Sequence, residues 1–592
     1  MNDQRNIILA VVLTMVILFG YDFFMAQFQP PVPVGTTQTS DTPQAAPQSA
    51  DVNFDDLPMA TAGPNQSDIG QSGLDMAAGS AQTQSRDAAI ADSVRITITS
   101  DKLKGSIRLA GGRLDDLILT EYHDTLEDDS PYVVLLAPQG TDNPYYVDYG
   151  WVSTTEPRSA LPGANTPWTT TNTKLTSSQP VILTWDNGEG LTFTRTYQID
   201  DNYMLDINQA VVNNSSRTVT VQPYGLIKRT GTPETSGFFI LHEGPIGVFE
   251  DGLEELSYED LRDEADIAFT STGGWTGITD KYWLTALIPA NEDHVAADFR
   301  HRKRNGIDQY QTSMRGDGGT LAPGQSMATQ TYLFAGAKIN SMIDVYSEEL
   351  NIRLFDRAID WGMLYYLTKP IFFALKYIND YVGNFGVAIL LLTVMIKALF
   401  FQLANKSYVS MSGMRKLQPK MAALREQYAD DKPRQQQELM KLYKEEKVNP
   451  VSGCLPMLVQ IPVFFALYKV LFVSIEMRQA PFFGWVHDLS APDTMLITNF
   501  FGLIPWDPPS MIAIGVWPLA MGLSMFVQQK LNPAPPDPIQ AKIFLMMPIM
   551  FTFLLASFPV GLVIYWTWNN LLTIAQQSVI MKRHGAFDKK AS

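Results

Sequence analysis

The spacing of hydrophobic residues changes along the chain and divides it into segments. Residues 7–25 are almost wholly apolar, a length typical of a membrane-spanning helix. No small-residue cleavage site follows this run, so we expect residues 1–28 to form an uncleaved signal-anchor span. Residues 29–93 are rich in Pro, Gln, Ser, Thr and Ala and contain few large apolar side chains. That composition predicts a disordered polar linker.

Between residues 94 and 340, apolar positions alternate with polar ones, as in half-buried β-strands. The clearest alternating runs are Val94/Ile96/Ile98, Leu191/Phe193/Arg195/Tyr197/Ile199, Val219/Val221 and Tyr332/Phe334. Turn signals such as Asp186-Asn187-Gly188 and Asn213-Asn214-Ser215 separate the runs. Many short strands over this length predict one large β-sandwich, and nothing in it resembles a catalytic constellation.

Residues 341–380 follow a helical rather than a strand pattern. A polar stripe consists of Arg353, Asp356, Arg357 and Asp360. The opposite, apolar stripe consists of Ile352, Phe355, Ile359 and Met363. Aromatic residues follow, so the segment predicts an amphipathic helix lying on the membrane, bent or broken near Pro370. An ordinary amphipathic helix packed on the β-domain explains the same stripe equally well, and both interpretations stay open.

Five further apolar runs lie within residues 381–583. We expect membrane spans near 382–403, 453–473, 511–529, 541–557 and 560–580. Together with the N-terminal anchor they make six spans, five of which would form a core. The predicted fold class is therefore a membrane α-helical bundle joined to a large all-β sandwich domain.

Residues 406–447, between the first two core spans, predict an antiparallel helical hairpin. One apolar stripe consists of Met414, Leu417, Met421, Leu424 and Tyr428, and a second of Leu439, Met440, Leu442 and Tyr443. Pro433 suits the first turn of the second helix. The basic residues of interest are Arg415, Lys416, Lys420, Arg425, Lys441 and Lys444. They form either the solvated face of a self-contained coiled coil or a docking surface for anionic partners such as ribosomal RNA or lipid headgroups.

The chain carries 61 acidic and 44 basic side chains, a net charge of −17, and the two signs are segregated. Ten Lys and Arg residues lie within 404–450, whereas 474–510 contains only Arg478. The positive-inside rule therefore places the hairpin, both termini and the short basic tail 584–592 in the cytoplasm. The β-domain is then external, which in a bacterial inner membrane means periplasmic. Cys454 is the single cysteine, and no clustered His or phosphate-binding loop predicts a metal or cofactor.

Lys397 is the candidate functional residue, because it lies inside the apolar run 387–401. A lysine near the middle of a membrane costs roughly 2.5–3.5 kcal/mol on insertion scales, so such residues are usually functional. The alternative is that its long side chain extends to the membrane surface. Thr393 precedes it by one helical turn on the same face. We expect Lys469, near the outer end of its span, to reach the periplasmic interface in that way.

Three motifs carry a resemblance to a known family. They are Met414-Arg-Lys-Leu-Gln-Pro-Lys420, the stretch from Val448-Asn-Pro-Val-Ser-Gly-Cys-Leu-Pro to Gln-Ile-Pro-Val-Phe464, and Phe558-Pro-Val-Gly-Leu-Val-Ile-Tyr-Trp566. These motifs resemble the YidC/Oxa/Alb family of membrane protein insertases, from about residue 350 to 583. The anchor, linker and β-domain are similar to the layout of Gram-negative members, which extends the resemblance to the whole chain.

The resemblance implies a non-enzymatic function. In this family five spans enclose a polar groove that is open to the cytoplasm and to lipid, and incoming proteins leave it sideways into the bilayer. The groove's positive residue matches Lys397, where most members have arginine. The other matching positions are Thr393, Gln460, Tyr565 and Trp566. Polar residues further along the last span either continue the lining or hold helices together, namely Asn569, Asn570, Gln576 and Gln577.

The implied partners are nascent membrane proteins, the Sec translocon, the ribosome, components of the signal-recognition-particle pathway, and anionic lipids. Two other functions stay open on the residues alone. A transporter or channel for an anionic solute would use Lys397 to bind its cargo, although further ionisable groups near mid-membrane would then be expected. A membrane-anchored, carbohydrate-binding periplasmic protein would use the β-domain and leave five spans without a purpose. The loop 479–510 is longer than the resemblance leads us to expect.

Overall fold

The structure is a computed structural model, and it describes residues 83–583 except 128, 237–240, 251, 291–292, 429–430, 447, 449–454, 507, 510–511 and 533–537. The predicted anchor at 1–28, the tail at 584–592 and the linker up to residue 82 lie outside the described residues. The end of the predicted linker contains a short helix, α2 (Arg86–Ala91), which begins after the capping residue Ser85.

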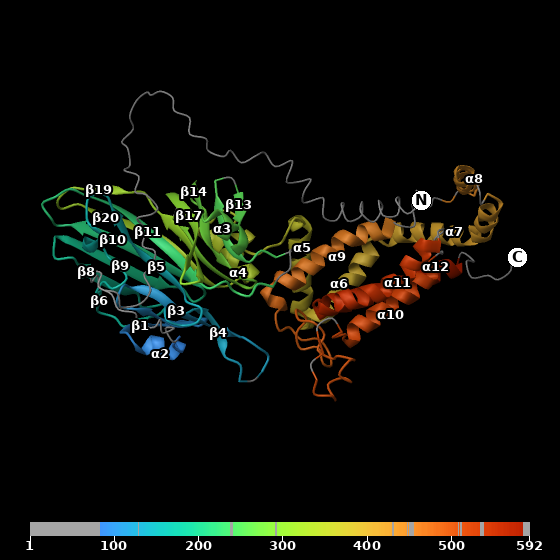
Figure 1. Cartoon of the computed structure of the whole chain (residues 1–592), viewed down its shortest axis with the longest axis horizontal. Coiled ribbons are helices and arrows are strands. Elements are labelled where there is room, and N and C mark those ends of the chain that lie inside the picture. The colour runs from blue at the N-terminus through green and yellow to red at the C-terminus, as the bar shows by residue number, and fades with distance from the viewer. Residues whose placement is uncertain are drawn as a thin grey trace, which may run out of the picture. The chain divides into compact units, whose positions relative to one another are not determined.

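Two antiparallel-dominated sheets form the β-domain. The first has the order β14-β17-β18-β11-β5-β3-β2-β1-β7, with β19 paired to β11 and β4 to β3. Its strands are β1 (Arg95–Thr99), β2 (Leu103–Arg108), β3 (Arg113–His123), β4 (Tyr132–Leu136), β5 (Tyr145–Ser153), β7 (Lys174–Leu175), β11 (Val219–Thr230), β14 (Asp266–Thr272), β17 (His294–Arg304), β18 (Ile307–Arg315) and β19 (Gly319–Leu321). Figure 1 shows the two sheets layered face to face. This arrangement is the predicted β-sandwich.

The second sheet has the order β13-β12-β15-β16-β20-β10-β9-β8-β6. Its strands are β6 (Thr169–Thr170), β8 (Val181–Asp186), β9 (Leu191–Ile199), β10 (Met204–Asn213), β12 (Gly244–Phe249), β13 (Gly252–Glu255), β15 (Trp275–Thr279), β16 (Trp283–Pro289) and β20 (Ser326–Ala337). Short helical turns connect some of the strands, namely η2 (Arg158–Ala160) and α3 (Tyr258–Glu264).

Strand β9 shows how the alternating pattern builds the core. Its odd-numbered positions are buried, and this inward face includes Arg195, which is only 1% exposed. The Arg195 guanidinium donates to the backbone carbonyl of Gly112 at 3.1 Å, which satisfies a charge that burial would otherwise destabilise. The preceding turn uses Gly188 at φ 73°, a conformation that glycine adopts without strain.

The segment 341–380 is not the single interfacial helix that its stripe predicts. It contains α4 (Asn340–Glu349), the short turn η3 (Phe355–Ala358) and α5 (Tyr365–Val382), and α5 continues through Pro370. The chain between α4 and α5 is irregular because its charged residues meet partners elsewhere in the fold. Asp360 accepts hydrogen bonds from the backbone of His242 (3.1 Å) and Gly362 (3.0 Å).

The carboxylate of Asp360 also binds the side chain of Lys469. Its Nζ lies 2.7 Å from Oδ2 of Asp360, so Lys469 forms an ion pair within the protein, and its position at the periplasmic interface stays a prediction. Asp356 likewise accepts from Lys369 at 3.2 Å. The acidic residues of the polar stripe, Asp356 and Asp360, thus form ion pairs with other parts of the fold and are not a solvated helix face.

The rest of the chain is helical. It comprises α6 (Phe385–Leu399), α7 (Phe401–Gln427), α8 (Lys432–Glu445), α9 (Leu455–Val473), η5 (Ile475–Met477), α10 (Val516–Leu531), α11 (Pro538–Leu554), η6 (Leu555–Ser557) and α12 (Val560–Arg583). Figure 1 shows α6 and α9–α12 gathered side by side in yellow to red. Helix α12 contacts α6, α7, α9 and α10, and so lies at the centre of the group.

Within the described residues, no single helix combines the length and apolarity needed to cross a membrane, whereas α6 and α7 together do. These two helices meet at an angle of 69°. Phe400 is the one residue between them, so the predicted span 382–403 ends at a sharp bend. The other predicted core spans coincide with α9–α12, and the count of six spans stays a prediction.

The helical hairpin has the predicted antiparallel form, with α7 and α8 as its two helices. Leu417 and Met421 are buried, and the Tyr443 hydroxyl lies 3.7 Å from the Met421 sulfur. Asp431 caps α8, and Pro433 lies in its first turn as predicted. Met440 departs from the prediction, because it is 57% exposed rather than part of the second apolar face.

Candidate functional site

Lys397 lies in the last turn of α6, and its side chain reaches the neighbouring helix α12. Its Nζ donates a hydrogen bond to Oγ1 of Thr573 at 2.7 Å. Thr573 donates in turn to the backbone carbonyl of Asn569 at 2.7 Å, so its hydroxyl is held in position to accept from the lysine. The ammonium therefore has a neutral partner, and the described contacts include no carboxylate beside it.

A cavity opens beside this ammonium. It is lined by residues of α6, α7 and α9, namely Ile396, Lys397, Phe400, Leu403, Ala404, Tyr408, Val459, Gln460 and Val463. It leaves about 40 Å³ for the centres of water molecules. A single water needs roughly 10–15 Å³ on this measure, so the cavity has room for several. Lys397 thus borders a space that water can occupy.

Gln460 faces the cavity from α9 and connects it to α12. Its side-chain amide bonds the hydroxyl of Tyr565, which is buried. Lys397 and Gln460 therefore border the same cavity, and Tyr565 lies directly behind Gln460.

The other two groove residues expected from the sequence lie elsewhere. Thr393 is buried, and its hydroxyl donates to the Ile389 carbonyl of its own helix at 2.7 Å. Trp566 packs edge-on against Phe464, with 4.6 Å between ring centroids, and against Phe551 at 5.6 Å. Neither side chain lines the cavity beside Lys397.

Thr573 is the site residue that sequence reasoning missed. The signal for it was present, because it follows Trp566 by about two helical turns on the same face of α12. The neighbouring polar residues hold helices together: Asn570 donates to Ser524 of α10 at 2.9 Å, and Gln577 donates to Asn532 at 3.0 Å. Of the two interpretations of these residues, helix association is the one with contacts in its support.

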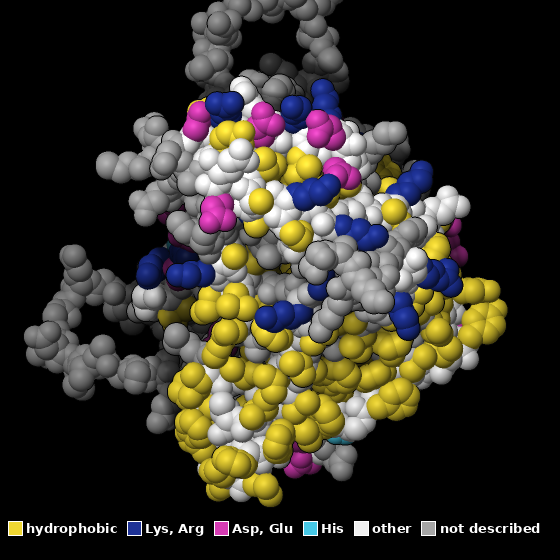
Figure 2. Space-filling view, turned by 90° about the vertical axis from the view of Figure 1, so that its right-hand side faces the viewer, with side chains coloured by type: hydrophobic (Ala, Val, Ile, Leu, Met, Phe, Trp, Pro, Cys, Tyr) yellow, Lys and Arg dark blue, Asp and Glu magenta, His cyan; other side chains and the backbone are white. Residues whose placement is uncertain are grey.

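The six basic residues of the hairpin divide into two groups. Lys416, Lys441 and Lys444 are exposed. Lys420 is exposed as well and pairs with Glu446 at 2.6 Å, and Lys441 lies 3.9 Å from Glu438. Arg415 and Arg425 are half-buried, and Arg415 donates to the Leu531 carbonyl at 3.4 Å. Figure 2 shows Lys and Arg side chains gathered in one part of the face that it presents.

Hydrophobic side chains cover much of the remaining surface of the helices. Figure 2 shows them as a nearly continuous area. The exposed ones on α10 and α11 are Leu519, Leu523, Phe526, Val527, Ile543, Phe544, Leu545, Met546, Ile549, Met550, Phe553 and Leu554. An apolar area of this extent is not stable in water and is typical of contact with lipid or protein.

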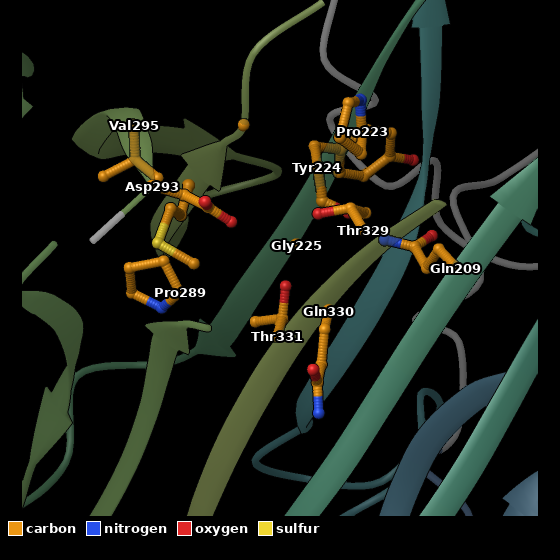
Figure 3. Close-up of a pocket in the computed structure, with 12 residues that line it drawn as sticks. Gln209, Pro223, Tyr224, Gly225, Pro289, Asp293, Val295, Thr329, Gln330 and Thr331 are labelled. Carbon is orange, nitrogen blue, oxygen red and sulfur yellow. Dashed lines mark hydrogen bonds between the residues drawn. The ribbon is translucent and has the colours of Figure 1, made fainter. Parts of the chain in front are cut away.

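A second pocket lies at one end of the β-sandwich. Figure 3 shows Gln209, Tyr224 and Thr329 around it. The pocket leaves about 20 Å³ for water centres, which is room for one or two water molecules.

Two family models match consecutive parts of the chain. The YidC periplasmic domain matches residues 95–374, and the 60Kd inner membrane protein matches residues 377–587. The membrane protein insertase YidC of Methylobacterium sp. (strain 4-46) is 47% identical over 604 residues, covering 99% of this chain and 96% of the relative. That of Beijerinckia indica subsp. indica is 49% identical, with the same coverage. A crystal structure of an active YidC insertase, 17% identical, gives a TM-score of 0.33 and covers 81% of this chain and 92% of that one.

Proposed function

This chain belongs to the YidC family of membrane protein insertases, and from that premise we propose that a nascent membrane protein enters it at the cavity beside Lys397. The family is one of inner-membrane proteins with a periplasmic β-domain, and its function is insertion rather than catalysis of a chemical reaction. The proposal concerns which residues of this chain receive the substrate and how they release it.

The observation that carries the proposal is the position of the Lys397 ammonium, which borders a cavity with room for water and has Thr573 as a neutral partner. A polar polypeptide tail crosses lipid slowly because its charges and backbone groups must lose their water. A hydrated cavity within the bundle shortens the dry part of that path. The lysine then attracts acidic residues of the tail.

The magnitude of this attraction suits a transient complex. Two opposite charges 4 Å apart attract by about 1 kcal/mol in water and by about 4 kcal/mol at an effective dielectric constant of 20. An interaction in this range favours entry and still allows release. The substrate then leaves along the apolar faces of α10 and α11, where exposed side chains such as Leu523 and Met546 meet lipid.

The hairpin would bind the cytoplasmic partners. Its exposed lysines, Lys416, Lys441 and Lys444, attract polyanions, so we assign to this surface the contact with the ribosome and with anionic lipid headgroups. The Sec translocon and the signal-recognition-particle pathway are expected partners on family membership. We also infer from the distribution of Lys and Arg residues that both termini lie in the cytoplasm.

Charge reversal at Lys397 tests the proposal. We expect Lys397→Glu to impair insertion of single-span substrates that have acidic translocated tails, because the variant repels them, and Lys397→Arg to retain insertion. The readout is protease protection of a radiolabelled substrate in vesicles carrying only the variant. Lys104→Glu, at an exposed position of β2, makes the same charge change outside the cavity and the hairpin and should leave insertion unchanged. Normal insertion by Lys397→Glu would refute the role of the cation.

Photocrosslinking maps the path itself. A photoreactive residue at position 460 borders the cavity, whereas one at position 566 is enclosed between Phe464 and Phe551. We expect a nascent substrate to crosslink at 460 and only weakly at 566. Equal crosslinking at both positions would mean that the substrate follows a different surface.

A further inference from the structure

The loop between α9 and α10 carries a cluster of exposed apolar side chains that the proposed function does not use. Its members are Phe500, Phe501, Leu503, Ile504 and Trp506, which we call the apolar tip. Leu503 is 82% exposed and Phe500 is 63% exposed. The sequence from Thr494 to Trp506 contains no charged residue. Such a cluster is unstable in water and typical of an interaction site.

The tip is presented by an ordered backbone. At its base, Leu496 bridges Gly515, and the Ile497 amide donates to the Ile514 carbonyl at 2.9 Å. Asp493 fixes the base further, because it accepts from the Trp485 indole (2.9 Å) and from the Trp517 amide (2.8 Å). The side chains of the tip are therefore exposed although the chain that carries them is held in place.

Two residues of the tip have an unfavourable backbone conformation. Phe500 has φ +51° and Phe501 has φ +61°, values that glycine or asparagine adopts more easily than a bulky residue. Within the tip, the Phe501 amide donates to Leu496 at 2.9 Å, and the Ile504 amide donates to Asn499 at 3.1 Å. Because a bulky residue at a left-handed position is strained, two exposed phenylalanines at such positions indicate that the rings themselves serve a purpose.

The position of the loop indicates what covers these rings. It begins beside Arg478, whose guanidinium donates to the Asp124 carbonyl of the β-domain at 3.2 Å, so it emerges at the end of the bundle nearest that domain. Figure 1 shows this loop in orange at the left-hand end of the helices, below α5 and α10. The periplasmic β-domain therefore identifies this end of the bundle as the periplasmic one.

Exposed apolar side chains also follow the tip along the chain, as far as α10. Ile512, Leu519 and Leu523 are exposed in succession, and the last two lie one turn apart on α10. That face of α10 is part of the apolar area that meets lipid. We propose that the apolar tip inserts into the periplasmic leaflet of the bilayer beside α10 and anchors the bundle there. Exposed aromatic rings without charges suit the boundary between headgroups and acyl chains.

This inference goes beyond the proposed function and rests only on placement in the membrane. The test uses the full-length protein in vesicles of phosphatidylethanolamine and phosphatidylglycerol. In a Cys454→Ser background, Leu503→Cys carries a nitroxide spin label. Ile307→Cys, 52% exposed in the β-domain, is the matched control. Collision rates with oxygen, which concentrates in lipid, and with a water-soluble nickel chelate then report immersion.

We expect the oxygen-to-nickel ratio at position 503 to exceed that at 307 several-fold. Equal ratios would place the tip in water and overturn the proposal. Exclusion of both reagents at 503 would mean that protein covers the tip, which would overturn it as well.

A second variant separates anchoring from folding. Phe500→Gly combined with Phe501→Gly removes both rings and places glycine where φ is positive, so we expect no fall in the thermal unfolding temperature. The ratio at position 503 should then decrease toward the control value. An unchanged ratio in this variant would show that the rings do not hold the tip in lipid.

Discussion

Lys397 and Thr573 join α6 to α12 by one charge-assisted hydrogen bond, and this pair is suited to a double-mutant cycle. Thr573→Val keeps the shape of the side chain and removes the acceptor, while Lys397→Met removes the donor. Hydrogen bonds to charged groups contribute about 1.5–3 kcal/mol in soluble proteins, but interhelical bonds in membranes average about 0.6 kcal/mol. With water available in the cavity, we expect a coupling free energy of about 1 kcal/mol.

The measurement is thermal unfolding of the single and double variants in detergent. Thr573→Ser retains the hydroxyl and serves as the control, with a small effect expected. Strictly additive changes would show that the Lys397–Thr573 contact contributes no stability.

Lys228 on β11 gives a prediction that depends on pH. Its side chain is buried, and its ammonium has no hydrogen-bond partner among the described residues. Burial, followed by the positive charges of Arg113 and Arg304, lowers the pKa of Lys228 to about 8. Between pH 8 and the ordinary lysine value near 10.5, the unfolded chain therefore binds more protons than the folded one.

Since the unfolded chain binds the extra proton, stability rises with pH across that interval and the charged lysine destabilises the fold below it. Lys228→Met should remove this contribution and raise the free energy of unfolding at pH 7 by about 1–3 kcal/mol. Thermal unfolding of the full chain at several pH values measures both effects. Lys104→Met, at an exposed position of β2, should change neither; a destabilised Lys228→Met variant would contradict the prediction.

At the scale of the element, helix α8 depends on its first turn. The Asp431 carboxylate accepts from the Arg434 amide at 3.1 Å and caps the helix. Asp431→Ala should cost about 1 kcal/mol of helix stability, which corresponds to roughly fivefold faster hydrogen exchange in α8. Asp431→Asn can still cap and should exchange like the natural protein. Unchanged exchange in the alanine variant would mean that tertiary contacts alone hold α8.

The elements that the sequence predicted correctly are those with a local cause. The hairpin follows from Pro433 and from the stripe that includes Leu417 and Met421, and strand β9 follows from simple alternation. Of the two interpretations of 341–380, the single interfacial helix does not form, and Asp356 and Asp360, which fall at helical spacing, pair with Lys369 and Lys469. Lys469 is distant in sequence, so the periodicity of the segment does not reveal it as a partner.

The candidate site was predictable to a similar extent. A lysine in an apolar run made Lys397 a candidate, because an ionisable residue in that setting is rare, and its role stays a prediction. The same reasoning did not suggest Thr573, because a threonine in a helix is common and acquires meaning only when two helices are placed together. Trp566 packs against Phe464 and Phe551, and its place in a substrate path also stays a prediction, since an aromatic residue satisfies groove-lining and helix-packing patterns equally.

At the scale of the whole molecule, the β-domain core includes residues beyond its last strand. Phe355 contacts Trp275 and Phe334, with ring centroids 5.6 and 5.5 Å apart, and Tyr346 bonds Asp200. Deleting 94–337 would therefore leave apolar side chains of α4 and η3 uncovered. Deleting 94–359 removes those residues as well and keeps Asp360 for its ion pair with Lys469.

We accordingly expect the larger deletion to accumulate in membranes at a higher level than the smaller one, as measured by immunoblotting of membrane fractions and by protease resistance. If the variant with the smaller deletion accumulates to the same level as the other, the apolar side chains of α4 and η3 must be buried by another part of the protein. The extent of this core was not visible in the sequence, because α4 and η3 carry no strand pattern.

The bend between α6 and α7 has a mechanical consequence. Only Phe400 separates the two helices, and Lys397 lies in the turn just before it. Movement of the hairpin should therefore be transmitted through this bend to the final turn of α6. When a large partner such as the ribosome binds or leaves the hairpin, we expect the final turn of α6 to rotate. That rotation would move the Lys397 ammonium toward or away from Thr573. Binding of a partner to the hairpin outside the bilayer would then change the position of the Lys397 ammonium inside the bundle, through the helices alone.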